Sequence, residues 1–173
     1  MRARAAAGSL VFLLVAPGAA AGLVPWLLSS WDSADPPLAL ELIGALLIAA
    51  GAAVLLHAFA RFVIEGVGTP APVAPTEHLV VQGAYRYVRN PMYLAVAATI
   101  VGQAALFGRP ALLLYAAAFM AVVAAFVRLY EEPVLSRRFG ETYEAYRDAV
   151  PAWCPRLRQG VRTRALLRRL PRS

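Results

Sequence analysis

Two long stretches of the chain are almost free of charge, and they limit the fold more than any other feature of the sequence. Residues 5–28 contain no charged side chain, and residues 38–64 contain only Glu41 near one end and Arg61 near the other. Because about 20 apolar residues cross the hydrocarbon core of a bilayer, each stretch is long enough to span it as a helix. The chain is 60% hydrophobic and 16% charged, a balance typical of membrane proteins. The sequence therefore predicts an all-α, polytopic membrane helical bundle.

A second pair of apolar segments, 92–107 and 111–127, is separated only by Gly108-Arg109-Pro110. So short a break predicts an antiparallel helical hairpin, and Pro91 suits the first turn of its first helix. Each segment is slightly short for an upright span, a mismatch that local thinning of the bilayer would accommodate. With the two longer stretches, the hairpin brings the expected number of spans to about four.

The N-terminal stretch has a competing interpretation. Arg2, Arg4, a short LVFLLV run and the alanines at 19–21 also resemble a cleavable signal peptide. The apolar run continues to residue 28, which is longer than a signal peptide needs and favours a retained span.

The distribution of arginine predicts the topology. Every basic residue is arginine, and arginines flank the spans at the N-terminus, after the second span and at the C-terminal end, whereas the first loop carries only Asp32 and Asp35. The positive-inside rule then places both termini in the cytoplasm, with Arg109 as the exception. The alanine- and arginine-rich, lysine-free composition suggests a GC-rich genome and hence a bacterial inner membrane.

We expect three parts in the chain. Residues 1–75 hold the N-terminal spans and a glycine- and proline-rich linker, and residues 76–157 hold a connector (76–90), the hairpin and a polar helix that follows Arg128. Residues 158–173 form a basic tail that is either an amphipathic helix on an anionic membrane surface or disordered. The single cysteine, Cys154, excludes an intrachain disulfide and supplies no metal cluster. No nucleic-acid partner is expected, and the oligomeric state stays open.

Charged and aromatic residues gather at two places where apolar segments end. The first is GAYRYVRNPMY at residues 83–93, and the second contains Arg128, Glu131 and Glu132. The hairpin should return the chain to its starting side, which would bring Arg89, Asn90 and Tyr93 close to the second cluster. Spacings of three and four residues would put both glutamates beside Arg128 on the polar helix.

The two clusters have two interpretations. Tyrosines, carboxylates and an amide together suit a nucleoside-bearing cationic cofactor, because carboxylates accept from hydroxyl or amino groups and aromatic faces attract cations. Alternatively, Tyr85, Tyr87 and Tyr93 form an interfacial aromatic belt, Arg86 and Arg89 are membrane anchors, and the glutamates cap an exposed helix start.

The quoted motifs carry a family resemblance. HLVVQGAYRYVRNPMYL, a helical hairpin and then RLYEEPVLSRRFGETYEAYRDAVPAWCP resemble the isoprenylcysteine carboxyl methyltransferase and phospholipid methyltransferase superfamily. Its members are integral-membrane enzymes that use S-adenosylmethionine. The resemblance covers residues 78–155 and implies cofactor contacts from His78, Leu79, Val80, Tyr85, Asn90, Pro91, Met92, Tyr93, Glu131 and Glu132. It also implies that Arg128 orients the substrate. Arg128, together with Asn90 of the family's motif, is therefore a candidate catalytic residue.

Asn90 departs from the family pattern, since many members have histidine at this position. Asparagine can donate and accept hydrogen bonds, but it cannot act as a base near neutral pH. Methyl transfer to an existing carboxylate needs alignment and desolvation but no base. The sequence therefore favours O-methylation of an isoprenylcysteine-like carboxylate on a lipophilic acceptor from the bilayer. Phospholipid amine N-methylation and thiol S-methylation are alternatives within the enzyme class, and a non-catalytic membrane scaffold is the alternative outside it.

Overall fold

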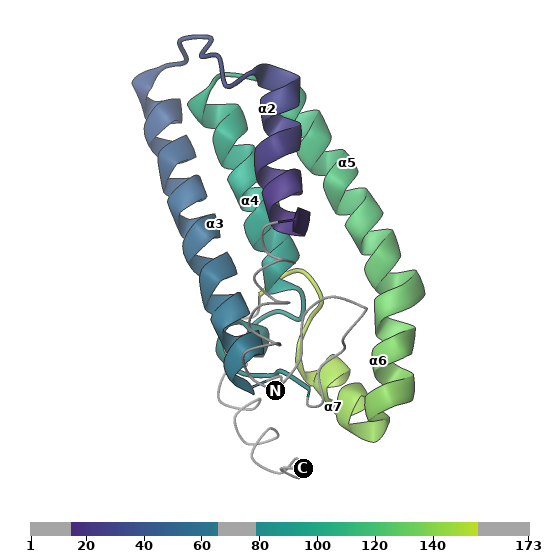
Figure 1. Ribbon diagram of the computed structural model, residues 1–173. Coiled ribbons are helices and arrows are strands. Elements are labelled where there is room, and N and C mark those ends of the chain that lie inside the picture. The colour runs from purple at the N-terminus through teal and green to yellow at the C-terminus, as the bar shows by residue number, and fades with distance from the viewer. Residues whose placement is uncertain (1–14, 66–78, 156–173) are drawn as a thin grey trace. The chain divides into compact units, whose positions relative to one another are not determined.

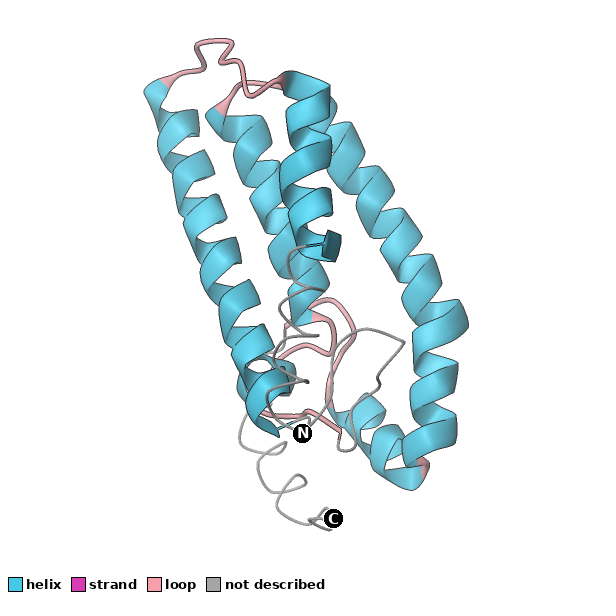
Figure 2. Ribbon diagram, in the orientation of Figure 1, coloured by secondary structure: helices cyan, strands magenta, loops and turns pink. Residues whose placement is uncertain are grey.

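The computed structural model describes residues 15–65 and 79–155, without the side chains of residues 62–65. All regular secondary structure in these residues is helical (Figure 2), which confirms the all-α prediction. The elements are the π-helical η1 (Ala19–Leu23), α2 (Val24–Ser29), α3 (Leu38–Glu65), the 3₁₀ turn η2 (Gly83–Arg86), α4 (Pro91–Leu106), α5 (Ala111–Phe126), the π-helical η3 (Val127–Glu131), α6 (Glu132–Phe139) and α7 (Glu141–Ala149). The basic tail and His78 lie outside the described residues.

Among the described residues, two helices have the length and composition of a membrane span. One is Leu38–Arg61, with 24 residues and a mean hydropathy of 2.4, and the other is Ala111–Phe139, with 29 residues and a mean hydropathy of 2.2. Val15–Ser29 and Pro91–Leu106 are shorter apolar helices. These four match the positions of the four predicted spans, and their composition is that of a helical membrane bundle.

The C-terminal polar segment differs from its prediction in one way. Its first part is continuous with α5, because α5, η3 and α6 form one helix that ends at Phe139. The prediction of a single polar helix is wrong, since Gly140 divides this segment into α6 and α7. Gly140 has φ +52° and ψ −130°, a conformation that glycine adopts far more readily than any other residue and that is incompatible with continuing the helix.

The chain packs as two compact units. The described residues of the first, here called the bundle unit, are 15–56 and 92–124. Those of the second, here called the connector unit, are 57–65, 79–91 and 125–155. Each unit has its own packing and is described separately.

Within the bundle unit, α3 and α4 approach each other through glycines (Figure 1). A Cβ atom built on Gly44 would lie 2.5 Å from the backbone nitrogen of Leu106, and one built on Gly102 would lie 2.8 Å from the carbonyl oxygen of Gly44. Gly51 is equally close to Thr99, with 2.5 Å between the added Cβ and the hydroxyl oxygen. Small residues allow this backbone-to-backbone packing, on which helix association in lipid depends.

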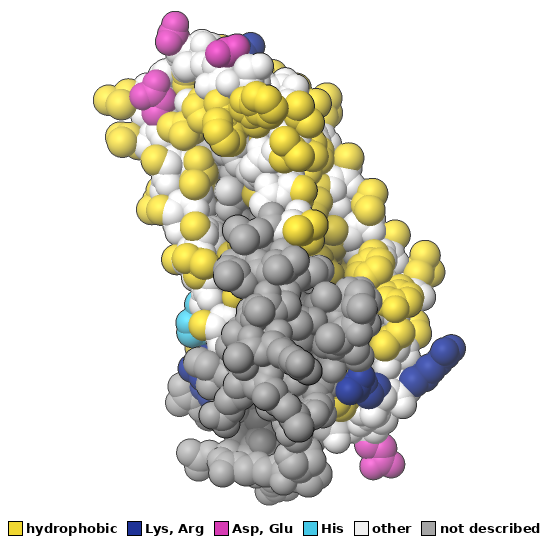
Figure 3. Space-filling view, in the orientation of Figure 1, with side chains coloured by type: hydrophobic (Ala, Val, Ile, Leu, Met, Phe, Trp, Pro, Cys, Tyr) yellow, Lys and Arg dark blue, Asp and Glu magenta, His cyan; other side chains and the backbone are white. Residues whose placement is uncertain are grey.

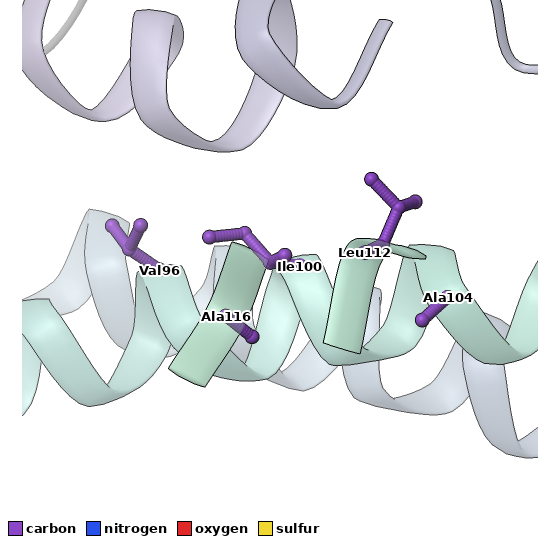
Figure 4. Close-up of a cluster of buried hydrophobic side chains, with 5 residues drawn as sticks. All are labelled: Val96, Ile100, Ala104, Leu112 and Ala116. Atoms are coloured by element: carbon purple, nitrogen blue, oxygen red, sulfur yellow. The ribbon is translucent and has the colours of Figure 1, made fainter. Parts of the chain in front are cut away.

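A cluster of buried side chains fills the space between α4 and α5 (Figure 4). Its members are Val96, Ile100 and Ala104 of α4 and Leu112 and Ala116 of α5. Ile100 and Leu112 are completely buried. Ala20 and Ala21 of η1 pack against the cluster, so the alanines of the signal-peptide interpretation form part of the bundle unit's packing.

Pro25 explains why the N-terminal helix is widened at η1. Proline has no backbone N–H, so the carbonyl oxygen of Ala21, four residues earlier, loses its helical partner. The side-chain amide of Gln103 donates to this oxygen at 2.6 Å, and the hydroxyl of Tyr115 donates to the adjacent carbonyl of Ala20 at 2.9 Å. The other end of the Gln103 amide accepts from the indole N–H of Trp31 at 3.1 Å. A buried polar side chain therefore completes a helix that proline interrupts.

Candidate functional site

The connector turns sharply at Gly83, where the connector unit begins to form its site. Gly83 has φ +62°, and a Cβ atom added to it would lie 2.6 Å from Nε2 of His57 and 3.3 Å from Cγ of Arg61. Both the backbone conformation and the available space therefore require glycine. This contact holds the turn η2 against the end of α3.

The apolar side of the connector packs on the C-terminal helices. Tyr143, Tyr146 and Val150 are 2%, 3% and 1% exposed and form a buried cluster. Leu79 and Val81 of the connector pack against this cluster, together with side chains of α6 and α7. Burial of two tyrosines and their aliphatic neighbours stabilises the contact between these distant segments of sequence.

Hydrogen bonds fix the register of this contact. The backbone N–H of Arg89 donates to the carbonyl of Pro151 at 2.9 Å, and the amide of Asn90 donates to the carbonyl of Ala152 at 3.2 Å. At the other end of the connector, the hydroxyl of Tyr146 donates to the carbonyl of Tyr85 at 2.8 Å. These three hydrogen bonds to residues far away in sequence restrict the conformation of the connector that precedes Pro91.

An ion pair joins the connector to the acidic pair. Nη1 of Arg89 lies 2.9 Å from a carboxylate oxygen of Glu132, and the two side chains are 12% and 24% exposed. The same nitrogen donates to the hydroxyl of Tyr143 at 3.2 Å. The predicted meeting of the two clusters is thus confirmed for Arg89 and Glu132.

A π-helical turn sets the positions of Arg128 and Glu131. In η3 the backbone N–H of Glu132 donates to the carbonyl of Val127, five residues earlier. Pro133 supplies the reason, because it lacks an N–H and cannot bond the carbonyl of Leu129. The helix is therefore wider than a regular α-helix between Arg128 and Glu132, and Glu132 pairs with Arg89. Such π-helical turns occur frequently at functional sites.

The predicted site residues differ in how accessible they are. Val80, Tyr85, Asn90 and Pro91 are buried, Leu79, Glu131 and Glu132 are half-buried, and Arg128 is exposed. Met92 and Tyr93 are half-buried and belong to the bundle unit. Within the described part of the connector unit, a bound molecule would therefore reach the side chains of the acidic pair and Arg128 most directly. The helix-cap interpretation of the glutamates is wrong, since both lie inside a continuous helix.

The two buried tyrosines remain neutral at physiological pH. Burial raises the pKa of Tyr143, while the charge of Arg89 partly opposes this shift. Burial also raises the pKa of Tyr146, whose hydroxyl is committed to the carbonyl of Tyr85. Both hydroxyls thus serve as neutral hydrogen-bonding groups.

Arg89 was predicted to come close to the acidic pair, with a membrane anchor as the alternative interpretation, but it was not assigned a role in cofactor binding or catalysis. Its partners Glu132, Tyr143 and Pro151 lie more than forty residues away in sequence, so no local pattern marks the contact. Among the described residues, no group of three histidine, cysteine, aspartate or glutamate side chains could hold a metal ion.

The sequence was compared with known protein families, curated proteins and solved structures. No curated protein and no solved structure matches it. The family model for phospholipid methyltransferase matches residues 40–142, which is more than half of the chain and includes the connector, α4, α5 and the acidic pair. The chain belongs to the phospholipid methyltransferase family, within the superfamily that its motifs resemble.

Proposed function

We propose that this membrane methyltransferase uses S-adenosylmethionine and methylates a lipophilic acceptor that reaches it from the bilayer. The observation that carries the proposal is the acidic pair, in which Arg89 holds Glu132 at 2.9 Å while Glu131 lies beside it on the widened turn η3. This places one carboxylate in a structural ion pair and a second, half-buried one next to it.

The donor set suits the proposed cofactor. The carboxylate of Glu131 would accept hydrogen bonds from the ribose hydroxyls or from the α-amino group of the cofactor. Both groups are donors, and a carboxylate is a strong acceptor. S-adenosylmethionine carries a sulfonium methyl group and supplies an electrophilic carbon to the acceptor. The protein's own contribution is to orient the two molecules and to exclude water, and Arg128, with its exposed guanidinium, would orient an anionic acceptor.

Asn90 bears on the choice of acceptor. Its side-chain amide donates to the carbonyl of Ala152 and is buried, so it serves the fold and supplies no proton acceptor. This supports an acceptor that is already nucleophilic, and an isoprenylcysteine-like carboxylate is our first candidate. The second candidate is a phospholipid amine, which the description of the matching family favours. A thiol would also be compatible with Asn90.

Binding of S-adenosylhomocysteine to purified protein in detergent tests the cofactor. We expect calorimetry to detect binding to the wild type and a loss of roughly tenfold or more in Glu131→Gln, because a hydrogen bond to a charged group contributes about 1.5–3 kcal/mol. The matched control is Glu141→Gln, which neutralises an exposed glutamate at the start of α7. No binding to the wild type, or equal losses in the two variants, would contradict the proposal.

A transfer assay then identifies the acceptor. Purified protein is given S-adenosylmethionine with a radiolabelled methyl group and, in separate reactions, a farnesylated cysteine analogue, phosphatidylethanolamine or an alkyl thiol. Label in the farnesylated analogue supports the first candidate, and label in phosphatidylethanolamine supports the second. Cofactor binding without transfer to any of the three would support the scaffold alternative.

A further inference from the structure

The helix that carries the acidic pair is longer than its apolar part. The 16 residues of α5 extend about 24 Å at 1.5 Å per residue, which is less than the hydrocarbon thickness of roughly 30 Å. The continuous helix Ala111–Phe139 has 29 residues and passes through η3 into α6. A span that ended with α5 would be too short, whereas one that continued into α6 would match the bilayer.

The surface of this helix stays apolar beyond the end of α5. Leu129 and Tyr130 of η3 are 77% and 47% exposed, and Val134 of α6 is 37% exposed. Phe126 is also exposed, and its ring stacks on that of Tyr130 with 5.3 Å between the ring centroids. These four residues form an outward-facing strip, called here the lower apolar strip. An exposed strip of large apolar side chains typically marks contact with lipid or protein.

Arginines follow directly after the strip. Arg137 and Arg138 are exposed in the last turn of α6, and Figure 3 shows basic side chains next to hydrophobic ones on this face of the molecule. The continuous helix Ala111–Phe139 has 29 residues, which corresponds to a length of about 43 Å at 1.5 Å per residue. A bilayer with its headgroups is about 40–45 Å thick, so a helix of this length suffices to reach the headgroup layer at its C-terminal end.

We propose that the lower apolar strip faces lipid hydrocarbon and that Arg137 and Arg138 contact anionic lipid headgroups of the same leaflet. The order of side chains, first apolar and then cationic, matches the order of hydrocarbon and headgroup in an anionic leaflet. A protein partner would not need this order. The proposal does not depend on the cofactor or the acceptor.

The proposal changes where the site lies in the membrane. The sequence placed the membrane boundary near Arg128, whereas this surface places it at the end of α6. Glu131 then lies about 9 Å inside the plane of Arg137, measured along the helix at 1.5 Å per residue. Carboxylates at this depth are costly unless they are paired, and for the adjacent Glu132 the ion pair with Arg89 meets this requirement.

Spin labels on single cysteines test the position of the strip. Cys154 is exposed and is the only cysteine in the chain, so Cys154→Ser provides a suitable background. Labels are placed at Leu129, Tyr130 and Val134, with Leu114 of α5 (76% exposed) as the lipid control and Glu141 as the water control. The protein is reconstituted in vesicles of phosphatidylcholine and phosphatidylglycerol. We expect collisions with oxygen to exceed those with a water-soluble nickel chelate at all three test positions, as at Leu114.

If labels at Leu129 and Tyr130 were as accessible to the nickel chelate as the label at Glu141, the proposed position of the strip would be overturned. Low accessibility to both reagents would also overturn it, because it would show a protein partner on this surface.

The headgroup contact is tested with spin-labelled lipids. We expect the wild type to prefer labelled phosphatidylglycerol over phosphatidylcholine at least twofold and Arg137→Gln/Arg138→Gln to lose this preference. Arg147→Gln is the matched control, because Arg147 is already paired with Glu144 at 2.6 Å. Equal preference in the wild type and the double variant would overturn the assignment of the two arginines.

Discussion

Nη1 of Arg89 lies 2.9 Å from the carboxylate of Glu132, and the pair connects the segment before α4 to the helix after α5. The backbone N–H of Arg89 is also bonded, to the carbonyl of Pro151. Both side chains are largely shielded from water, so removing either one would leave the charge of the other partly buried without a partner. Pro133 lacks the backbone N–H that would bond the preceding turn of the helix at η3. The ion pair fixes the position of Glu132 next to this turn.

Breaking this ion pair should destabilise the connector unit. Arg89→Leu leaves Glu132 partly buried without its partner, and we expect a loss of about 3 kcal/mol in the free energy of unfolding. Arg147→Leu, which breaks an exposed pair with Glu144, should cost only about 0.5 kcal/mol. Denaturant titration in detergent, followed by circular dichroism, measures both. A reversed pair, Arg89→Glu/Glu132→Arg, should recover part of the stability, and equal losses in the two leucine variants would contradict the role of the pair.

Gly83 offers a separate test of the connector's turn. Gly83→Ala places a methyl group in a left-handed conformation and against the ring of His57. A left-handed conformation alone costs an alanine roughly 1–2 kcal/mol, and the contact with His57 adds to this, so we expect Gly83→Ala to lose more than about 2 kcal/mol in the free energy of unfolding. The double variant His57→Ala/Gly83→Ala should recover the steric part relative to His57→Ala alone. If Gly83→Ala cost the same in the His57→Ala background as in the wild type, His57 would not be close to the turn.

The apolar helices were predictable because their signal is local. A bilayer requires a run of about 20 apolar residues, and prolines and glycines mark where each run stops. Pro91, Gly108 and Pro110 placed the boundaries of α4 and α5 within about one residue of those observed. The joining of the two charged clusters was also predictable, since a short hairpin must return the chain to its starting side.

Other features depended on partners far away in sequence. The π-helical turns η1 and η3 each end two residues before a proline, at Pro25 and Pro133. Both prolines were visible in the sequence, but proline alone does not reveal whether a helix breaks or widens. At Pro25 the outcome depends on Gln103, which supplies the missing donor from α4. Sequence spacing therefore gave a regular α-helix where the structure has a wider turn.

Gln103 should be essential to the bundle unit because it replaces the hydrogen bond that Pro25 cannot make. Gln103→Leu leaves the carbonyl of Ala21 and the indole N–H of Trp31 without their observed partner. An unsatisfied buried group costs about 1–3 kcal/mol, but Trp31 is 48% exposed and the bond to Ala21 is partly buried, so we expect a loss of roughly 1–2 kcal/mol in unfolding experiments in detergent. Pro25→Ala restores an N–H, so the double variant Pro25→Ala/Gln103→Leu should lose less than the sum of the single changes. Strict additivity would show that Gln103 does not compensate for Pro25.

Tyr146 makes the stability of the connector unit sensitive to alkali. Its pKa is raised by burial above the ordinary value of 10.0, so above about pH 10 the unfolded chain loses this proton while the folded chain retains it. The folded state then binds more protons than the unfolded state, and stability must fall as pH rises. We expect full stability below pH 10, a decline above it, and a shallower decline in Tyr146→Phe, which also loses about 1 kcal/mol at neutral pH with its bond to Tyr85. Denaturant titration between pH 8 and 11 measures the slope, and absorbance at 295 nm follows tyrosinate formation. An identical slope in Tyr146→Phe would show that another group causes the decline.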